Sequence, residues 1–186
     1  MNAEQENNNT NLRALGEEHG YVVLQGTANG LIITSWSNSD DARVMEMFNG
    51  IAASDALTID RTKFHATGFS QGGYMTWRLA QAHPDVWASI APLAGSLSGA
   101  APTTRIPTLY HQGKDDPLVS YSSALRTVEA VRSAWGLDEG EVIEESEAHL
   151  RRRHRSEDSG ATLLEFIEPV LWLVFCGVFT QNVTPF

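Results

Sequence analysis

The pentapeptide Gly68-Phe69-Ser70-Gln71-Gly72 constrains the fold of this chain more than any other feature. A strand-like run, residues 63–67, precedes it, and a helix-like run, residues 73–80, follows it. Small residues on both sides of a serine allow a strand and a helix to cross closely at a sharp turn. Such a turn lifts the hydroxyl clear of the sheet, and the first amides of the helix favour negative charge beside it. The pattern therefore predicts a reactive serine, Ser70, in preference to a glycine-rich turn without function.

Composition and charge limit the class of protein. The 186 residues are 42% hydrophobic, which fits one globular domain with a core, and the net charge of −10 disfavours nucleic acid as a partner. The longest apolar run, residues 169–179, is shorter than the roughly 20 residues of a membrane-spanning helix, so we expect no membrane span. Residues 1–12 are polar and show no signal peptide, which leaves the compartment unknown. The single cysteine, Cys176, allows no internal disulfide, and we expect a buried, unreactive thiol.

Strand-like and helix-like runs alternate along the chain, which predicts an α/β fold with a mostly parallel sheet and helices on both faces. We expect helices after the pentapeptide and over residues 11–19, 41–53 and 120–135. We expect strands over residues 21–25, 63–67, 87–93, 107–111 and 161–167. The segment 138–158 is first acidic and then arginine-rich, and we expect a solvated connection there. This gives a disordered start at 1–10, a domain at 11–168 and an apolar tail of uncertain structure at 169–186.

A serine nucleophile needs a base, an acid that orients the base, and hydrogen-bond donors for the oxyanion. After a strand–Gly-x-Ser-x-Gly–helix turn, the acid and then the histidine follow in chain order. Asp116 or Asp115 comes directly after the strand-like run 107–111, at the sheet edge where we expect Ser70. His149 and His154 follow in the charged segment and are weak candidates for the base, since solvated surface positions are more typical there.

The oxyanion donor that we expect is the backbone N–H of Gln71, the residue after the nucleophile. No organic cofactor is required for this chemistry. We also expect no metal site, because His149 and His154 lack a third ligand at a suitable spacing.

Three stretches carry a resemblance to a known family: Ile59–Thr76 around the pentapeptide, Ala91–Ser96, and His111–Tyr121. Together they resemble the polyhydroxybutyrate depolymerase/feruloyl esterase family of α/β hydrolases. The resemblance implies a carboxylic-ester hydrolase of hydroxyalkanoate or hydroxycinnamoyl esters, of secreted type, with Ser70 as the nucleophile. The family's G-x-x-D-x-x-V turn falls on Gly113, Asp116 and Val119, which favours Asp116 over Asp115 as the acid.

The chain departs from this family at both ends. The family has a histidine in a Gly-Gly-His-like loop after its last strand, whereas this chain reads Glu-Pro-Val-Leu-Trp-Leu at 168–173. The family's first strands, with their oxyanion loop, have no counterpart. We therefore expect a truncated α/β-hydrolase fold, incomplete at the N-terminus and divergent in its C-terminal tail, with impaired catalysis.

Two alternatives stay open. The run Gly-Phe-Ser-Gln-Gly-Gly at 68–73 also fits an acyl-protein thioesterase or small carboxylesterase, which would prefer acyl-thioesters to short-chain p-nitrophenyl esters. A non-catalytic hydrolase remnant would turn over neither.

Overall fold

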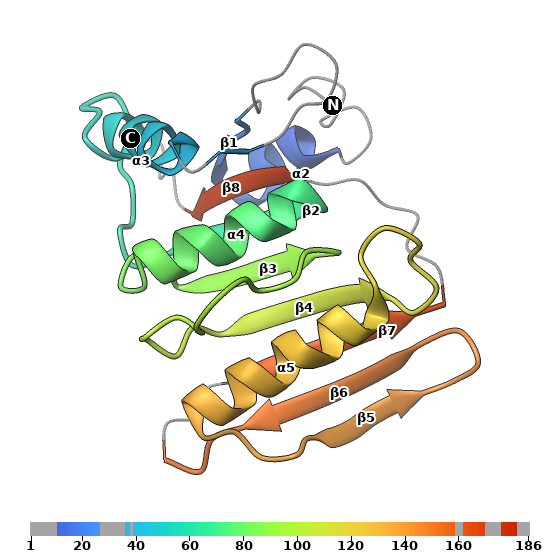
Figure 1. Ribbon diagram of the computed structural model, residues 1–186. Coiled ribbons are helices and arrows are strands. Elements are labelled where there is room, and N and C mark those ends of the chain that lie inside the picture. Colours follow the sequence, from blue (N-terminus) through green and yellow to red (C-terminus); the bar gives the residue numbers. More distant parts are fainter. Residues whose placement is uncertain (1–10, 27–35, 38, 159–161, 170–175, 182–186) are drawn as a thin grey trace.

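A mixed sheet forms the centre of the computed structural model, which describes residues 11–26, 36–37, 39–158, 162–169 and 176–181 (Figure 1). Within these residues the sheet has eight strands, in the order β1-β8-β2-β3-β4-β7-β6-β5. Their bounds are β1 Tyr21–Leu24, β2 Phe64–Phe69, β3 Ser89–Leu93, β4 Thr108–Gly113, β5 Glu141–Glu145, β6 Leu150–Arg155, β7 Thr162–Glu168 and β8 Cys176–Gln181. The central strands β2, β3, β4 and β7 are parallel neighbours, as the alternation of elements predicted.

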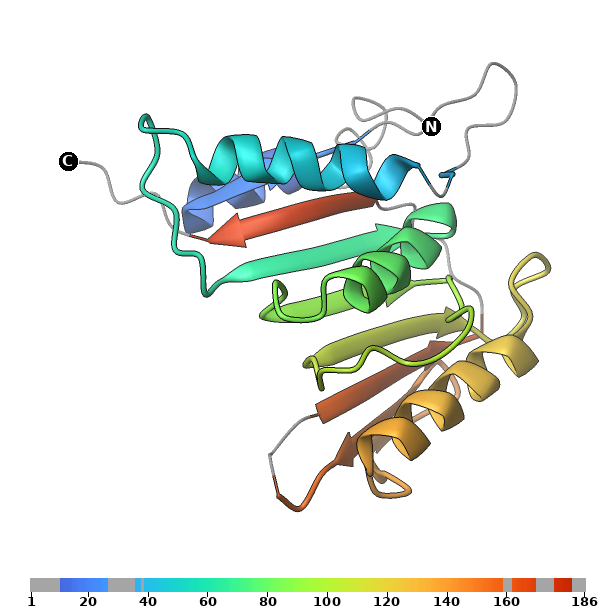
Figure 2. The ribbon, with the colours of Figure 1, turned by 60° about the vertical axis from the view of Figure 1, so that its left-hand side comes forward.

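Four helices of the described residues cover the sheet: α2 Leu12–His19, α3 Asp40–Ala52, α4 Gln71–Ala82 and α5 Tyr121–Trp135. Helices α3, α4 and α5 lie together on one face, which we call the helical face (Figure 2). Helix α2 lies on the opposite face over β1, where a Cβ at Gly16 would lie 2.7 Å from the Val23 side chain. The predicted α/β class, with helices on both faces of a mostly parallel sheet, is confirmed. Every predicted helix and strand is present, with small shifts at the ends.

The core lies between the helical face and the sheet. Trp77 and Trp135 are almost completely buried, and their indole N–H groups donate to the carbonyl oxygens of Gly95 (3.0 Å) and Pro102 (2.9 Å). Such bonds remove the cost of burying a polar tip, so each ring contributes its apolar area, at roughly 25 cal/mol per Å², to stability. Tyr110 of β4 packs against Trp77, and burial raises the pKa of its phenol to about 12.

The charged segment 138–158 does not form the solvated connection that we expected, because β5 and β6 pair within it as an antiparallel hairpin. Strand β6 then extends the sheet by pairing with β7, also antiparallel. The pairing places glutamates opposite arginines, for example Glu141 opposite Arg153 and Glu144 opposite Arg151. Opposite charges on neighbouring strands stabilise such a ladder, so the two charge blocks specify a hairpin.

Strand β8, from the C-terminal tail, lies between β1 and β2 and is antiparallel to both. It thereby connects the first strand of the chain to the strand that precedes Ser70. The predicted character of the Cys176 thiol and of the residues 1–10 falls outside what the structure describes. Among the described helices, none is both long and apolar enough to cross a bilayer.

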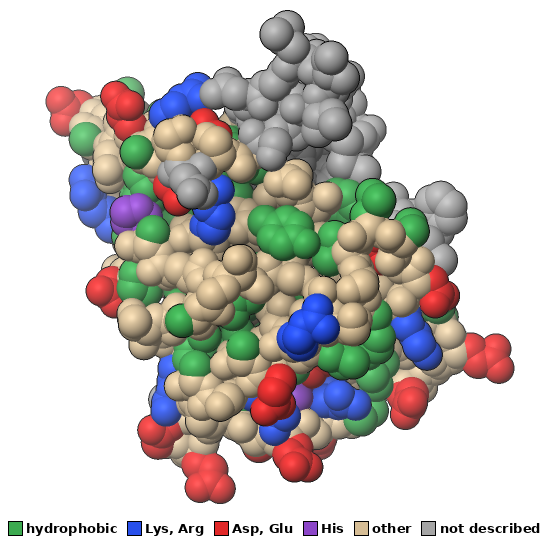
Figure 3. Space-filling view, viewed as in Figure 1, with side chains coloured by type: hydrophobic (Ala, Val, Ile, Leu, Met, Phe, Trp, Pro, Cys, Tyr) green, Lys and Arg blue, Asp and Glu red, His purple; other side chains and the backbone are tan. Residues whose placement is uncertain are grey.

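On the helical face, charged side chains of both signs lie mainly toward the rim, with hydrophobic side chains dispersed between them (Figure 3). The predicted absence of a nucleic-acid partner stays a prediction.

Candidate active site

Ser70 occupies a sharp turn between β2 and α4. Its backbone has φ 52° and ψ −113°, in the positive-φ region that a non-glycine residue seldom adopts. Two hydrogen bonds hold it there: its N–H donates to the Leu93 carbonyl at 2.8 Å, and its carbonyl accepts from Tyr74 at 3.1 Å. Strain of this kind persists only where the surrounding structure enforces it, and it clusters at functional sites. Ser70 is half-buried.

The glycines around Ser70 are required by close packing. A Cβ at Gly68 would lie 2.4 Å from the Gly72 carbonyl carbon, so strand and helix touch through their backbones. A Cβ at Gly73 would lie 2.6 Å from the Leu93 carbonyl oxygen, and one at Gly95 would lie 2.5 Å from the Gly73 carbonyl carbon. The close packing that requires glycine beside Ser70 therefore extends to the end of the neighbouring strand β3.

Gln71 is the first residue of α4. The N–H groups in the first turn of a helix have no acceptor within the helix, and they carry the positive end of its dipole. The Gln71 N–H is thus placed beside Ser70 as an oxyanion donor would be, and its role stays a prediction.

Asp116 lies in the loop between β4 and α5, and Oδ1 of its carboxylate accepts from the N–H groups of Leu118 (2.8 Å) and Val119 (2.9 Å). Because β2, β3 and β4 are parallel, this loop and Ser70 leave the sheet at the same edge. They are two strands apart, or about 10 Å at a spacing of ~4.8 Å. The second oxygen, Oδ2, makes no hydrogen bond with a described residue. Asp115 instead donates its N–H to the Pro169 carbonyl at 2.8 Å, which ties this loop to the end of β7.

The structure does not bring His149 to Ser70. His149 precedes β6 at the same sheet edge, but β6 is four strands from β2, or about 19 Å. Its Nε2 lies 2.8 Å from Glu144 Oε1, and its ring packs on Phe166 with 5.6 Å between centroids.

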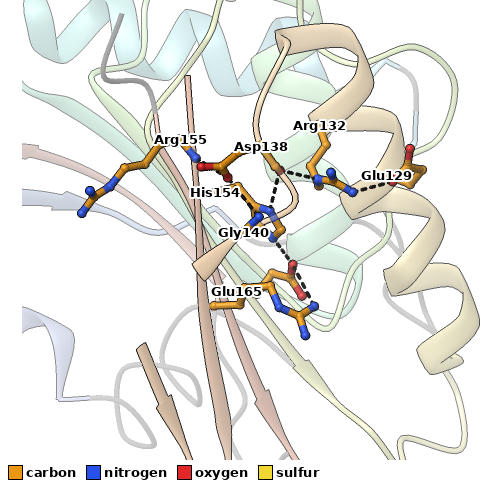
Figure 4. A network of polar contacts seen from close by, with 8 residues as sticks. Glu129, Arg132, Asp138, Gly140, His154, Arg155 and Glu165 are labelled. Carbon is orange, nitrogen blue, oxygen red and sulfur yellow. Dashed lines mark hydrogen bonds and ion pairs between the residues drawn. The ribbon is translucent and has the colours of Figure 1, made fainter. Parts of the chain in front are cut away.

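His154 lies farther from Ser70 than His149 does, and it is buried, where we expected a solvated histidine. Its position opposite Leu163 places it toward the other edge of the sheet. His154 Nε2 contacts Glu165 Oε1, and its Nδ1 lies 3.1 Å from the Asp138 carbonyl oxygen (Figure 4). Both partners of the His154–Glu165 pair are 1% exposed. The β5–β6 hairpin causes this burial, because it adds a strand on which alternate side chains face α5.

His111 lies closer to Ser70 along the sheet than His149 or His154 does, and no catalytic role was predicted for it from the sequence. It lies near the end of β4, two strands from Ser70, and its carbonyl accepts from Ala94 at 2.8 Å. Burial lowers the pKa of its imidazole, although Glu168, with Oε2 at 3.5 Å from Nε2, acts in the opposite direction. The ring packs on Phe166, with 4.7 Å between centroids. Its place before Asp116 in the chain, and its strand-end pattern, gave no signal of a role in catalysis.

Within the described residues, the Ser70 hydroxyl makes no hydrogen bond, so no histidine is seen in contact with it. The same residues contain no group of three or more His, Cys, Asp or Glu side chains that could hold a metal ion.

Comparison with known proteins gives the class to which the chain is similar. No protein-family model matches it. A curated relative, described as "Putative esterase NocK" from Nocardia uniformis subsp. tsuyamanensis, is 33% identical over an alignment of 132 residues, and the match covers 62% of this chain. The chain spans only 37% of the length of that relative.

A solved structure, "Crystal Structure of a Thermostable Esterase", is 22% identical, with a TM-score of 0.47, over 56% of this chain and 28% of its own. The description of the curated relative as an esterase agrees with the expected hydrolase class. Neither description refers to polyhydroxybutyrate or to feruloyl esters.

Proposed function

We propose that the chain carries the nucleophile elbow of a serine carboxylic-ester hydrolase. The observation that supports this most directly is the strained, half-buried Ser70 between a buried strand and the first turn of α4. In the proposed reaction Ser70 Oγ attacks the acyl carbonyl, and the Gln71 N–H donates to the oxyanion that forms. The alcohol then leaves with a proton, and water hydrolyses the acyl-serine ester.

The proposed hydrolase is impaired at its proton transfer. Asp116 is the proposed orienting acid, with Oδ2 available for an imidazole. The two candidate bases, His149 and His154, lie four strands from Ser70 in this structure. Members of a Ser-His-Asp triad act as a unit, so loss of the base lowers turnover by several orders of magnitude. We therefore propose slow ester hydrolysis, in which Ser70 remains the residue that reacts.

The proposed substrates are hydroxyalkanoate or hydroxycinnamoyl esters, on the resemblance of residues 59–121 alone. Hydrolysis of 3-hydroxybutyrate oligomers or methyl ferulate in preference to acyl-thioesters would support this assignment. The reverse preference would favour a thioesterase or small carboxylesterase.

Labelling by a fluorophosphonate probe tests the elbow itself, because the probe reacts with activated serine hydroxyls. We expect the wild-type chain to be labelled and Ser70→Ala to be unlabelled. Ser89→Ala is the matched control, since Ser89 is also half-buried and its hydroxyl lies 2.7 Å from His65 Nδ1. Labelling that depends on Ser89 would refute the role of Ser70.

A non-catalytic remnant is the second candidate, favoured by the lack of a described imidazole at the Ser70 hydroxyl. A folded wild-type chain that the probe does not label would support it.

A further inference from the structure

The loop that carries Asp116 is closed by one buried amide. Gln112, near the end of β4, is completely buried, and its Nε2 donates to the carbonyl oxygens of Gly113 (3.1 Å) and Val119 (3.0 Å). These two carbonyls lie at the two ends of the loop that leads from β4 into α5 (Figure 1). A single side chain therefore ties the beginning of the loop to its end.

The end of the loop also holds the carboxylate. Val119 accepts from Gln112 through its carbonyl, and its N–H donates to Asp116 Oδ1 at 2.9 Å. The Leu118 N–H donates to the same carboxylate oxygen at 2.8 Å. A chain of hydrogen bonds thus runs from the strand, through Val119, to Asp116. It uses Oδ1 and leaves Oδ2, the oxygen proposed to face an imidazole, outside the chain.

Backbone hydrogen bonds support the other side of this loop. The Lys114 N–H donates to the Glu168 carbonyl at 2.6 Å, and the Asp115 N–H donates to the Pro169 carbonyl at 2.8 Å. Both bonds join the loop to the end of β7, whereas Gln112 supports the part that leads into α5. The loop is therefore fixed on both sides of Asp116.

The pairing of the Gln112 amide is one-sided. Its Oε1 is buried and accepts no hydrogen bond from a described residue. Buried polar groups are normally paired, so an unpaired one calls for a physical reason. The NH₂ group has two donors, one for each loop carbonyl, and their placement leaves the oxygen unpaired. The contact that this amide makes is therefore directed at the loop.

We propose that Gln112 is a positioning residue for Asp116, an inference that rests on the proposed function. Gln112 contacts no reacting atom and acts through the loop. A displacement of about 1 Å in a group that aligns a reaction can lower the rate about a hundredfold. Methionine has a similar length but no donor. We expect Gln112→Met to lower the rate of fluorophosphonate labelling at Ser70 at least about tenfold.

A double-mutant cycle separates positioning from a general effect on the fold. Asp116→Asn keeps the oxygen that accepts from the loop N–H groups, so the loop keeps its shape while the charge is lost. In that background Gln112→Met should change the labelling rate by less than about twofold, because the carboxylate that Gln112 positions is already absent.

The matched control is Gln81→Met. Gln81 Nε2 also donates to two loop carbonyls, those of Ser98 (2.8 Å) and Ala100 (2.6 Å). That loop carries none of the proposed site residues. Gln81→Met should therefore be labelled at the wild-type rate.

Amide hydrogen exchange of the Val119 N–H, followed by NMR, reports on the loop without relying on labelling. We expect Gln112→Met to accelerate this exchange at least about tenfold and Gln81→Met to leave it unchanged. Circular dichroism establishes that each variant is folded. If Gln112→Met does not fold, Gln112→Asn replaces it with the same expectations, because its amide is shorter by one methylene group and should not hold both carbonyls.

The proposal would be overturned if the Gln112 variant lost labelling equally with and without the Asp116 carboxylate. Labelling at the wild-type rate, or unchanged Val119 exchange, would overturn it as well. A wild type that is not labelled at Ser70 would refute the proposed function itself. Accelerated Val119 exchange in that case would leave Gln112 as a support of the loop without a positioning role.

Discussion

The buried pair of His154 and Glu165 provides the sharpest test of how the β5–β6 hairpin is held to the sheet. Each ring nitrogen of His154 faces an acceptor: Nε2 contacts the Glu165 carboxylate, and Nδ1 lies 3.1 Å from the Asp138 carbonyl oxygen. That carbonyl also accepts from Arg132 Nε at 2.7 Å, on α5 (Figure 4). Both ring nitrogens of His154 therefore have a polar partner inside the protein.

Replacing His154 by leucine would remove the closest polar partner of the Glu165 side chain, which is 1% exposed, and leave Arg152 Nη1 at 4.0 Å as its remaining charged neighbour. Removing one member of a buried polar pair in this way costs about 3–5 kcal/mol. For a domain of this size each kcal/mol lowers the melting temperature by about 2–4 °C, so we expect a decrease of about 6–20 °C. The double variant His154→Leu/Glu165→Leu should recover most of the loss, because well-packed apolar residues can replace a buried pair at little cost.

Thermal and urea unfolding at pH 7, followed by circular dichroism, measures these differences. The control is His149→Leu, because His149 pairs with Glu144 on the same hairpin but at the surface. We expect little change from that variant, since exposed pairs contribute little. The reasoning would be refuted if the two single histidine variants had equal melting temperatures, or if the double variant were less stable than His154→Leu.

Three further outcomes follow from the site. Gly73→Ala should lower stability and abolish probe labelling, because the new Cβ would lie 2.6 Å from the Leu93 carbonyl oxygen. The control is Gly50→Ala in α3, where nothing lies within 4 Å of the new Cβ. That variant should stabilise the chain by about 0.5–1 kcal/mol in urea unfolding. Asp116→Asn should keep the hydrogen bonds to the loop and the melting temperature but reduce the labelling rate, and an unchanged rate would exclude Asp116 from the site. Burial lowers the pKa of His111, so the unfolded chain binds a proton that the folded chain excludes. Stability should therefore fall as the pH drops below about 6.5, and His111→Phe should weaken that dependence in unfolding titrations between about pH 7 and 5; an identical dependence in both would contradict it.

The elements and the elbow were predictable because their signals are local. The run of residues 63–73 combines a strand, two close glycine contacts and a helix start, and each can be recognised within a few positions of Ser70. The carboxylate of Asp116 was predictable for a related reason, since the ends of parallel strands share one edge of a sheet. The role of Ser70 and Asp116 in catalysis stays a prediction until labelling is measured.

The sequence alone thus determined an α/β chain with a strained serine after a buried strand. Only the tertiary structure decided which strands are neighbours, because pairing joins segments far apart in the chain and no single segment encodes its partner. That pairing placed β8 between β1 and β2, and β6 beside β7. The position of β6 buried His154 against Glu165 and kept His149 and His154 away from Ser70. Among the described residues, the tertiary structure also placed α3, α4 and α5 on one face of the sheet and α2 on the other.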